Sequence, residues 1–257
     1  MENNFYNIFD SHAHYDDKWF DEDREVLLSS MKENGVCGIV NNAVDLKTAK
    51  VCIDFCEKYD FMYGAVGFHP ENLEDMPNDY LDRVAELLKH KKIVAVGETG
   101  LDYHWDISKD LQNRVFEEQI KLSLDVNMPI IVHDREAHGD TLNYLRKYKP
   151  KALVHCFSGS VEMMREVMRY GSYISLGGVV TFKNARHSVE VAKEVPIDRL
   201  LLETDCPYMS PVPFRGKRCD STMIKYTAEK IAEIRNTDVQ KLLNITAENA
   251  KRFYGID

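Results

Sequence analysis

The segment Ile8-Phe9-Asp10-Ser11-His12-Ala13-His14 is a short apolar run that leads into two histidines, and it is the first of six comparable segments in this chain. The other five are Ala65-Val66-Gly67-Phe68-His69, Val94-Ala95-Val96-Gly97-Glu98, Ile130-Ile131-Val132-His133, Ala152-Leu153-Val154-His155 and Leu200-Leu201-Leu202-Glu203-Thr204-Asp205. Because the strands of a parallel barrel deliver their C-terminal residues to one face, these polar side chains are predicted to converge. Converging imidazoles and carboxylates are typical ligands of divalent metal ions.

Outward from these segments, strand-like runs alternate with helical patterns along the chain, which favours a parallel sheet. The predicted strands are 7–12, 36–42, 62–68, 93–98, 129–133, 151–157, 172–177 and 200–205. The predicted helices are 21–34, 46–59, 78–90, 109–126, 136–148, 160–170, 185–195, 221–235 and 237–254. The 257 residues are close to the roughly 250 of one (β/α)8 barrel. We predict an α/β fold with a single TIM-barrel domain over residues 1–257. An open doubly wound sheet is the weaker alternative, since it would hold the first and last strands apart.

The composition limits the partners. A formal net charge of −9 makes the chain a poor general trap for nucleic acid, so a phosphate substrate must be held locally by metal ions and a few cations. No apolar run approaches the ~20 residues of a membrane span, and the N-terminus shows no secretory pattern. We therefore expect a cytoplasmic protein with no membrane contact and no obligate protein partner. The six cysteines are expected to be reduced, with Cys156 and Cys206 turned away from the site.

His12 and His14 are separated by one residue, so on a strand they share a face and can chelate one ion. Asp10 is expected on that same face, where it could orient one imidazole ring. Asp205 ends the eighth strand, which adjoins the first in a closed barrel. We interpret Asp205 as a ligand and as the acceptor of a proton from water. Glu203 lies two residues earlier and deeper, as a supporting acid.

Glu98 stands between Gly97 and Gly100, which leave room for a carboxylate close to metal and substrate. A carboxylate can bridge two ions, so Glu98 is the candidate bridge. The alternative is a buried glutamate paired with an arginine. His133 and His155 end neighbouring strands and indicate a second metal site, although either one alone would be read as a core histidine.

These motifs carry a family resemblance. The segments FDSHAH, GFHPE, VGETGLDYHW, PIIVHDREAHGDTL, VHCFSGS and LLETDCPYMSPVPFRGKR, between residues 9 and 218, resemble the TatD family of metal-dependent deoxyribonucleases, within the amidohydrolase-type barrel superfamily. The resemblance implies one metal ion on His12, His14, Glu98 and Asp205, and another on Glu98, His133 and His155. It places His69 at the active face without a clear ligand role. One departure is Cys219-Asp220-Ser221, where the family usually continues Asn-Glu-Pro.

The predicted reaction is hydrolysis of phosphodiester bonds at single-stranded DNA ends, with a 3′ polarity that only the resemblance implies. Two cations would activate water and neutralise charge on the phosphate. The proposed catalytic residues are Asp205, His69 and Glu203. Histidine ligands favour zinc or manganese as the bound ions, with magnesium as an assay activator.

Substrate contacts are expected on the loops that follow the strands, with Pro207–Pro213 as an active-face loop. The candidate phosphate-binding residues are Arg135, Ser158 and Arg215, and Tyr103 and Trp105 could stack a base. Arg135 could instead lie on a helix surface, and Tyr103 could be rim packing.

Two rival functions stay open from the sequence. The first is a hydrolase of a small ester, lactone or phosphotriester on the same barrel. Against it, Glu98 occupies the strand end where related hydrolases carry a carbamylated lysine. The second is a barrel that binds nucleic acid or protein without turnover, which the intact ligand set disfavours.

Overall fold

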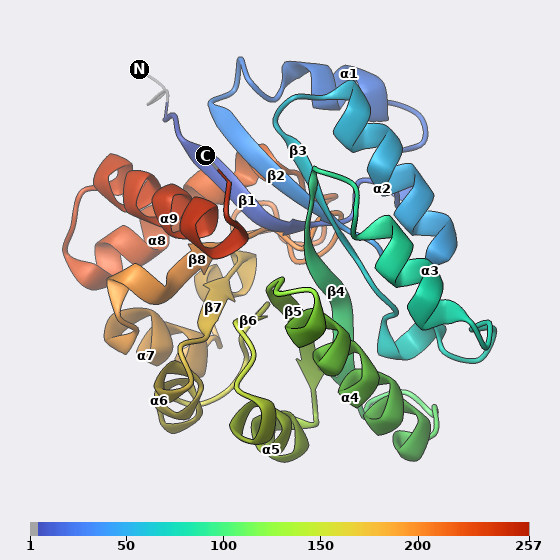
Figure 1. The fold of residues 1–257 in the computed structure, drawn as a ribbon. Coiled ribbons are helices and arrows are strands. Elements are labelled where there is room, and N and C mark those ends of the chain that lie inside the picture. The colour runs from blue at the N-terminus through green and yellow to red at the C-terminus, as the bar shows by residue number, and fades with distance from the viewer. Residues whose placement is uncertain (1–4, 257) are drawn as a thin grey trace.

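The computed structural model describes residues 5–256, in which eight parallel strands follow one another in the order β1 to β8. Beyond β8 the ladder continues onto β1 through a parallel bridge between Ala13 and Cys206. Two backbone hydrogen bonds support it, from His14 N–H to Cys206 O at 2.8 Å and from Asp205 N–H to His12 O at 3.0 Å. The sheet is therefore a nearly closed barrel with helices around its outside (Figure 1), which confirms the predicted α/β TIM-barrel class.

The observed elements follow the predicted order. The strands are β1 (Ile8–Ala13), β2 (Val36–Asn42), β3 (Met62–Val66), β4 (Ile93–Asp102), β5 (Ile130–Arg135), β6 (Ala152–Val154), β7 (Tyr173–Leu176) and β8 (Leu200–Leu202). The helices are α1 (Arg24–Ser30), α2 (Leu46–Lys58), α3 (Tyr80–Leu87), α4 (Lys109–Asp125), α5 (His138–Tyr148), α6 (Val161–Arg169), α7 (Arg186–Glu194), α8 (Ile224–Arg235) and α9 (Val239–Tyr254). In the described part of the chain, no helix combines the length and apolar character needed to cross a membrane.

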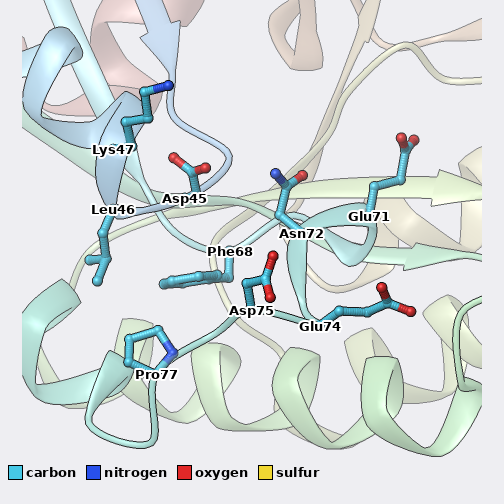
Figure 2. Close-up of a pocket in the computed structure, with 9 residues that line it drawn as sticks. All are labelled: Asp45, Leu46, Lys47, Phe68, Glu71, Asn72, Glu74, Asp75 and Pro77. Atoms are coloured by element: carbon cyan, nitrogen blue, oxygen red, sulfur yellow. The ribbon is translucent and has the colours of Figure 1, made fainter.

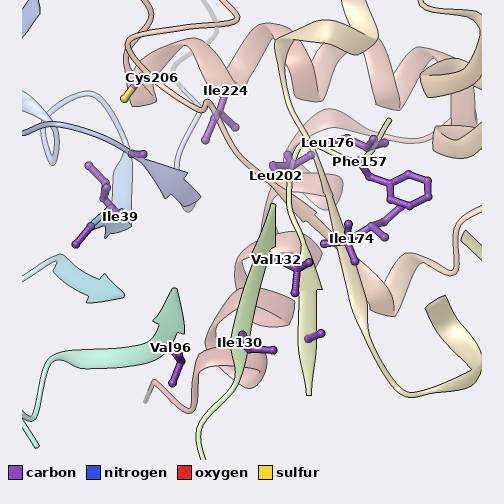
Figure 3. Close-up of a cluster of buried hydrophobic side chains, with 14 of the residues drawn as sticks. Ile39, Val96, Ile130, Val132, Phe157, Ile174, Leu176, Leu202, Cys206 and Ile224 are labelled. Atoms are coloured by element: carbon purple, nitrogen blue, oxygen red, sulfur yellow. The ribbon is translucent and has the colours of Figure 1, made fainter. Parts of the chain in front are cut away.

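Side-chain alternation along the strands separates two apolar layers. The outer layer packs between strands and helices, and Val96, Val132 and Leu202 belong to it (Figure 3). The inner layer is formed by Phe9, Val40, Ala65, Ala95, Ile131, Leu153, Tyr173 and Leu201, together with residues of α9. Since side chains alternate, the inward position two residues beyond Ile131, Leu153 and Leu201 falls on a histidine or glutamate. The polar cluster therefore lies directly above an apolar floor.

The C-terminal helix α9 packs against this floor. Phe253 and Tyr254 belong to the inner layer, and the rings of Phe9 and Tyr254 are stacked with centroids 6.4 Å apart. The buried Tyr254 hydroxyl donates a hydrogen bond to Ser11 O at 2.7 Å, immediately before His12. The last helix thus supports the strand that carries the first two histidines.

One local expectation is wrong, because Asp10 does not share the face of His12 and His14. The β1–β2 register shifts between Asp10 and Ala13, so simple alternation fails there. The Asp10 carboxylate accepts hydrogen bonds from the Thr204 hydroxyl at 2.6 Å and the Ser221 hydroxyl at 2.7 Å. Asp10 therefore fastens β1 to the segment after β8, and orients neither imidazole.

Candidate metal centre

The buried carboxylate of Glu98 lies between two groups of histidines, one on each of its oxygens. Oε2 lies 3.2 Å from His12 Nε2 and 3.3 Å from His14 Nε2. Oε1 lies 2.9 Å from His133 Nδ1 and 2.8 Å from His155 Nε2. Strands β1 and β5 and the residues that follow β1 and β6 thus bring four predicted histidine ligands around the Glu98 side chain of β4.

The glycines near Glu98 allow backbone conformations that other residues would not adopt. Gly97 has φ +139° and Gly100 has φ +149°, conformations that L side chains rarely adopt. A Cβ on Gly100 would lie 2.0 Å from His133 O, and one on Gly97 would lie 2.9 Å from Ile131 O. Both glycines therefore permit the close approach of β4 to β5 that carries Glu98 to His133.

Asp205 reaches the cluster from the opposite end of the chain. Its Oδ1 lies 3.5 Å from His14 Nε2 and 3.8 Å from His12 Nε2. The residue adopts a left-handed backbone with φ 58°, a conformation that aspartate tolerates better than most residues. The closure hydrogen bonds between β1 and the segment after β8 fix this distance.

Two of the histidines have partners behind them that set the direction of the ring. His14 Nδ1 lies 2.9 Å from Asn42 O, which leaves Nε2 facing Glu98. His133 Nε2 lies 3.0 Å from Asp102 Oδ2, which leaves Nδ1 facing Glu98. A carboxylate or carbonyl behind a metal-binding imidazole fixes its tautomer and raises its basicity.

Asp102 was missed by the sequence reasoning, which ended the fourth strand at residue 98, whereas β4 continues to Asp102. Its signal was available, because Glu98, Gly100 and Asp102 alternate on one strand and so share a face.

Glu203 lies behind His155. Its Oε1 is 3.8 Å from His155 Nδ1, and its Oε2 accepts a hydrogen bond from the Ser175 hydroxyl. The side chain is fully buried and does not line the cavity above the cluster. This place fits the expected deeper position of Glu203 and suits support of His155.

His69, in the loop after β3, presents its Nε2 to Glu98 Oε1 at 3.4 Å. Its Nδ1 accepts the Glu71 N–H at 3.2 Å. A neutral imidazole with Nδ1 as acceptor carries its proton on Nε2, so His69 presents a donor to the site. Burial lowers the pKa of His69, which favours this neutral form.

The charges of the cluster are strongly coupled. Burial would raise the pKa of Glu98, but His155, His12 and His69 hold it well below its usual range. Burial opposes protonation of His133, yet its bonds to Asp102 and Glu98 raise its pKa to about 9. The pKa of His14 is also raised against the effect of burial, through Asp205 and Glu98. The carboxylates therefore create a place that favours positive charge.

The donor set fits divalent metal ions. The Nε2 atoms of His12 and His14 lie 3.0 Å apart while both face the same carboxylate oxygen. His133 Nδ1 and His155 Nε2 lie 3.2 Å apart on the other oxygen. In each group two imidazole nitrogens point at each other and at one carboxylate oxygen. A central cation satisfies all three atoms better than protons can. Two such points on either side of Glu98 could each hold an ion.

A cavity of about 720 Å³ opens above the cluster. Its lining includes His14, His69, Glu98, His133, His155 and Asp205. Of the predicted substrate residues, Arg135, Ser158 and Trp105 also line it. Arg135 lies with its guanidinium carbon 5.8 Å from the centre of the Trp105 ring. Cys156, expected to turn away, lines the cavity as well, because its φ of 42° interrupts strand alternation.

Two predicted contacts are not brought to the cavity. The Tyr103 hydroxyl donates to Asp140 at 2.7 Å, and the Lys109 ammonium lies 4.1 Å from the centre of its ring. The Arg215 guanidinium carbon lies 4.4 Å from the centre of the Phe182 ring. The described lining contains neither residue. Tyr208, which the sequence reasoning did not select, does line the cavity, and it belongs to the loop predicted at Pro207–Pro213.

A second hollow of about 360 Å³ shares Glu71 and Asn72 with the main cavity (Figure 2). It contains the carboxylates of Asp45, Glu71, Glu74 and Asp75, with Lys47 at its edge. This side of the barrel mouth is therefore strongly acidic and repels phosphate groups.

The barrel and the histidine–carboxylate cluster at its mouth define a metal-dependent hydrolase of the TIM-barrel type. The chain belongs to the TatD-related DNase family, whose model matches residues 9–255. The metal-dependent hydrolase YabD of Bacillus subtilis is 46% identical over 97% of this chain and 100% of its own length. The TatD homolog YJJV of Escherichia coli superposes with a TM-score of 0.90 at 27% identity, covering 98% of this chain and 99% of its own. The human 3′-5′ RNA nuclease TATDN2 is 28% identical over 97% of this chain and 35% of its own length. The family resemblance drawn from the motifs is confirmed.

Proposed function

We propose that this hydrolase is a nuclease that removes nucleotides from the 3′ end of single-stranded DNA with two divalent ions. The observation that carries the proposal is the position of Glu98, with one oxygen on His12 and His14 and the other on His133 and His155. Asp205 would complete the first site. Imidazole-rich sites favour zinc or manganese, and magnesium would act as an activator in assays.

Bound there, the ions would supply water activation near neutral pH and neutralise charge on the phosphodiester. The residues of the chain do the rest. Asp205, whose Oδ1 lies 3.5 Å from His14 Nε2 and which lines the cavity, accepts the proton of the attacking water. His69 presents its Nε2 proton to a phosphate oxygen, a role that suits a neutral imidazole better than that of a strong acid. Arg135 and Ser158 in the cavity wall bind the phosphate.

The shape and charge of the mouth support the preference for strand ends. A recess of about 720 Å³ is of the size that holds small ligands, roughly 300–1,000 Å³. It suits a terminal nucleotide and excludes the flank of a duplex. Among the described lining residues Arg135 is the one arginine or lysine, so the chain has little long-range attraction for a polyanion. The nuclease named among the relatives adds support for a nucleic-acid substrate.

The test is timed hydrolysis by enzyme loaded with Mn²⁺ or Zn²⁺ of single-stranded DNA blocked at the 3′ end, blocked at the 5′ end, or circular. A matched RNA strand and a panel of esters, lactones and phosphotriesters run in parallel. Release of mononucleotides from every linear strand with a free 3′ end, and none from circles, is the expected result. Efficient cutting of circles would refute the end requirement. Turnover confined to the small esters would refute the nuclease.

A further inference from the structure

Two exposed aromatic side chains continue the wall of the cavity outward. Tyr208 lines the cavity and is 47% exposed, and Trp19, just beyond it, is 49% exposed. Their ring centroids lie 6.1 Å apart with the planes at 46°. Tyr208 N–H donates to Asp205 O at 3.0 Å, so this aromatic pair is built onto the loop that carries the proposed proton acceptor.

Hydrogen bonds hold the Tyr208 side chain and the Trp19 backbone in place. The Tyr208 hydroxyl donates to Asp17 Oδ2 at 2.8 Å, while Asp17 Oδ1 accepts the Trp19 N–H at 2.8 Å. One carboxylate therefore binds both the Tyr208 side chain and the Trp19 backbone. Arg218 donates to Trp19 O at 2.7 Å and forms a bidentate pair with Asp23 at 2.7 and 2.6 Å. Because these bonds already order the Tyr208 side chain and the Trp19 backbone, binding would not have to order those groups.

The charged groups around Tyr208 and Trp19 determine whether phosphates or bases bind there. Asp17 at its centre is a carboxylate, and Arg218 is paired with Asp23, so neither of these two groups offers a phosphate a free cation. The neighbouring side of the mouth, at Glu71 and the hollow beside it, is acidic (Figure 2). Arg135 lines the main cavity itself. A strand that places its reacting phosphate near Arg135 would then present bases, and not phosphates, to Tyr208 and Trp19.

We propose that Tyr208 and Trp19 form a stacking surface for the bases of the nucleotides that follow the reacting one. The inference rests on the proposed function, since it requires a single strand in the cavity. Aromatic rings stack on any base, so the surface gives affinity without sequence preference. It replaces the electrostatic attraction that a chain with net charge −9 lacks.

The kinetic test compares the metal-loaded parent with Trp19→Ala and Tyr208→Ala on single-stranded DNA. Stacking on an aromatic residue predicts a KM raised roughly 5- to 100-fold with kcat within about twofold. Trp19→Phe should recover most of the loss, since it restores a ring. The matched control is Tyr6→Ala, an aromatic residue that is 56% exposed and precedes β1 at the other end of the barrel. Unchanged KM in both alanine variants would overturn the proposal.

A binding test is independent of turnover. The chain has two tryptophans, Trp19 and Trp105, so Asp205→Asn with Trp105→Phe leaves Trp19 as its only tryptophan. Short oligodeoxythymidine should quench its fluorescence, and an abasic strand with the same phosphates should not. Equal quenching by both strands would overturn base stacking. If the parent hydrolyses no strand, the proposed nuclease function is refuted. The quenching experiment still tests whether bases stack on Trp19. A dimer that Trp19→Ala dissociates, with KM unchanged, would assign the surface to self-association and also overturn the proposal.

Discussion

Replacement of Asp102 by asparagine tests the arrangement behind the second pair of histidines. Both carboxylate oxygens of Asp102 are acceptors: Oδ1 takes the His104 N–H at 3.0 Å, and Oδ2 faces His133 Nε2 at 3.0 Å. Asparagine has one such oxygen. If it stays on His104, the amide NH₂ faces His133 and places the imidazole proton on Nδ1, where it points at Glu98. The variant thus favours the tautomer that cannot bind metal through Nδ1.

The size of the effect follows from the lost charged hydrogen bond, worth roughly 1.5–3 kcal/mol. Since 1.4 kcal/mol is about tenfold, metal affinity should fall roughly 10- to 100-fold, as it does for other partners of metal-bound histidines. The fold should be retained, because the Gln112 bonds to the Asp102 backbone, both 2.8 Å, remain.

The assay is equilibrium dialysis against graded Zn²⁺ with a competing chelator, together with hydrolysis rates over the same metal range. Excess metal should restore most of kcat, because Asp102 positions a ligand and does not touch substrate. Asp134→Asn is the matched control: Asp134 pairs with His138 at 2.8 Å, outside the cluster, so metal affinity should not change. Affinity of Asp102→Asn within twofold of the parent, or a loss that excess metal fails to restore, would refute the reasoning.

Four further results are expected. Glu98→Gln should lower the bound metal from about two ions per chain toward one or none, by elemental analysis after loading, because an amide cannot bridge as a carboxylate does; a ratio unchanged at two would contradict the bridge. Asp205→Asn should reduce kcat at least ~100-fold with an unchanged circular dichroism spectrum, and near-normal turnover in saturating metal would exclude Asp205 as the proton acceptor. The slope of log affinity for single strands against log salt should be no steeper than about −3, at −0.7 per neutralised phosphate; a slope beyond about −6 in Asp205→Asn would mean an extended cationic track. Metal binding at pH 7 should release protons, because the metal-free fold raises the pKa of His133 from 6.5 to about 9, whereas a metal ion binds the neutral imidazole. The protonated imidazole stabilises the metal-free fold, and this stabilisation is lost as the pH rises toward 9. Calorimetry in buffers of different ionisation enthalpy measures the release, and heats independent of the buffer would contradict it.

The strand-end pattern was sufficient to predict the barrel and the convergence of its polar residues. Strict alternation placed His133 and His155 on the inner face, because they lie two residues beyond the inner-layer residues Ile131 and Leu153. Glu98 lies three residues beyond the inner-layer residue Ala95, and it faces inward because the β4–β5 register shifts between Val96 and Thr99. Asp205 was placed by the closure of the barrel, which brings the last strand beside the first.

The errors and omissions fall where backbone regularity ends. Asp10 was misplaced because β1 shifts register, and Cys156 because its φ is positive. Tyr103 and Arg215 were selected from loop position alone, but the direction of a loop side chain depends on local partners such as Asp140 and Phe182. No periodicity encodes those partners.

The hydrogen bond from Tyr254 to Ser11 joins positions separated by 243 residues, and Asp205 joins His12 across nearly as much chain. A ribosome must therefore complete almost the whole polypeptide before β1 acquires both of its neighbours and its support from α9. Until that moment His12 and His14 lie near the start of a nascent chain. They lack both the carboxylate of Asp205 and the complete inner apolar layer below them. The histidine–carboxylate cluster consequently forms late in biosynthesis. A chain truncated before α9 would lack the helix that supports β1, the strand that leads into His12 and His14.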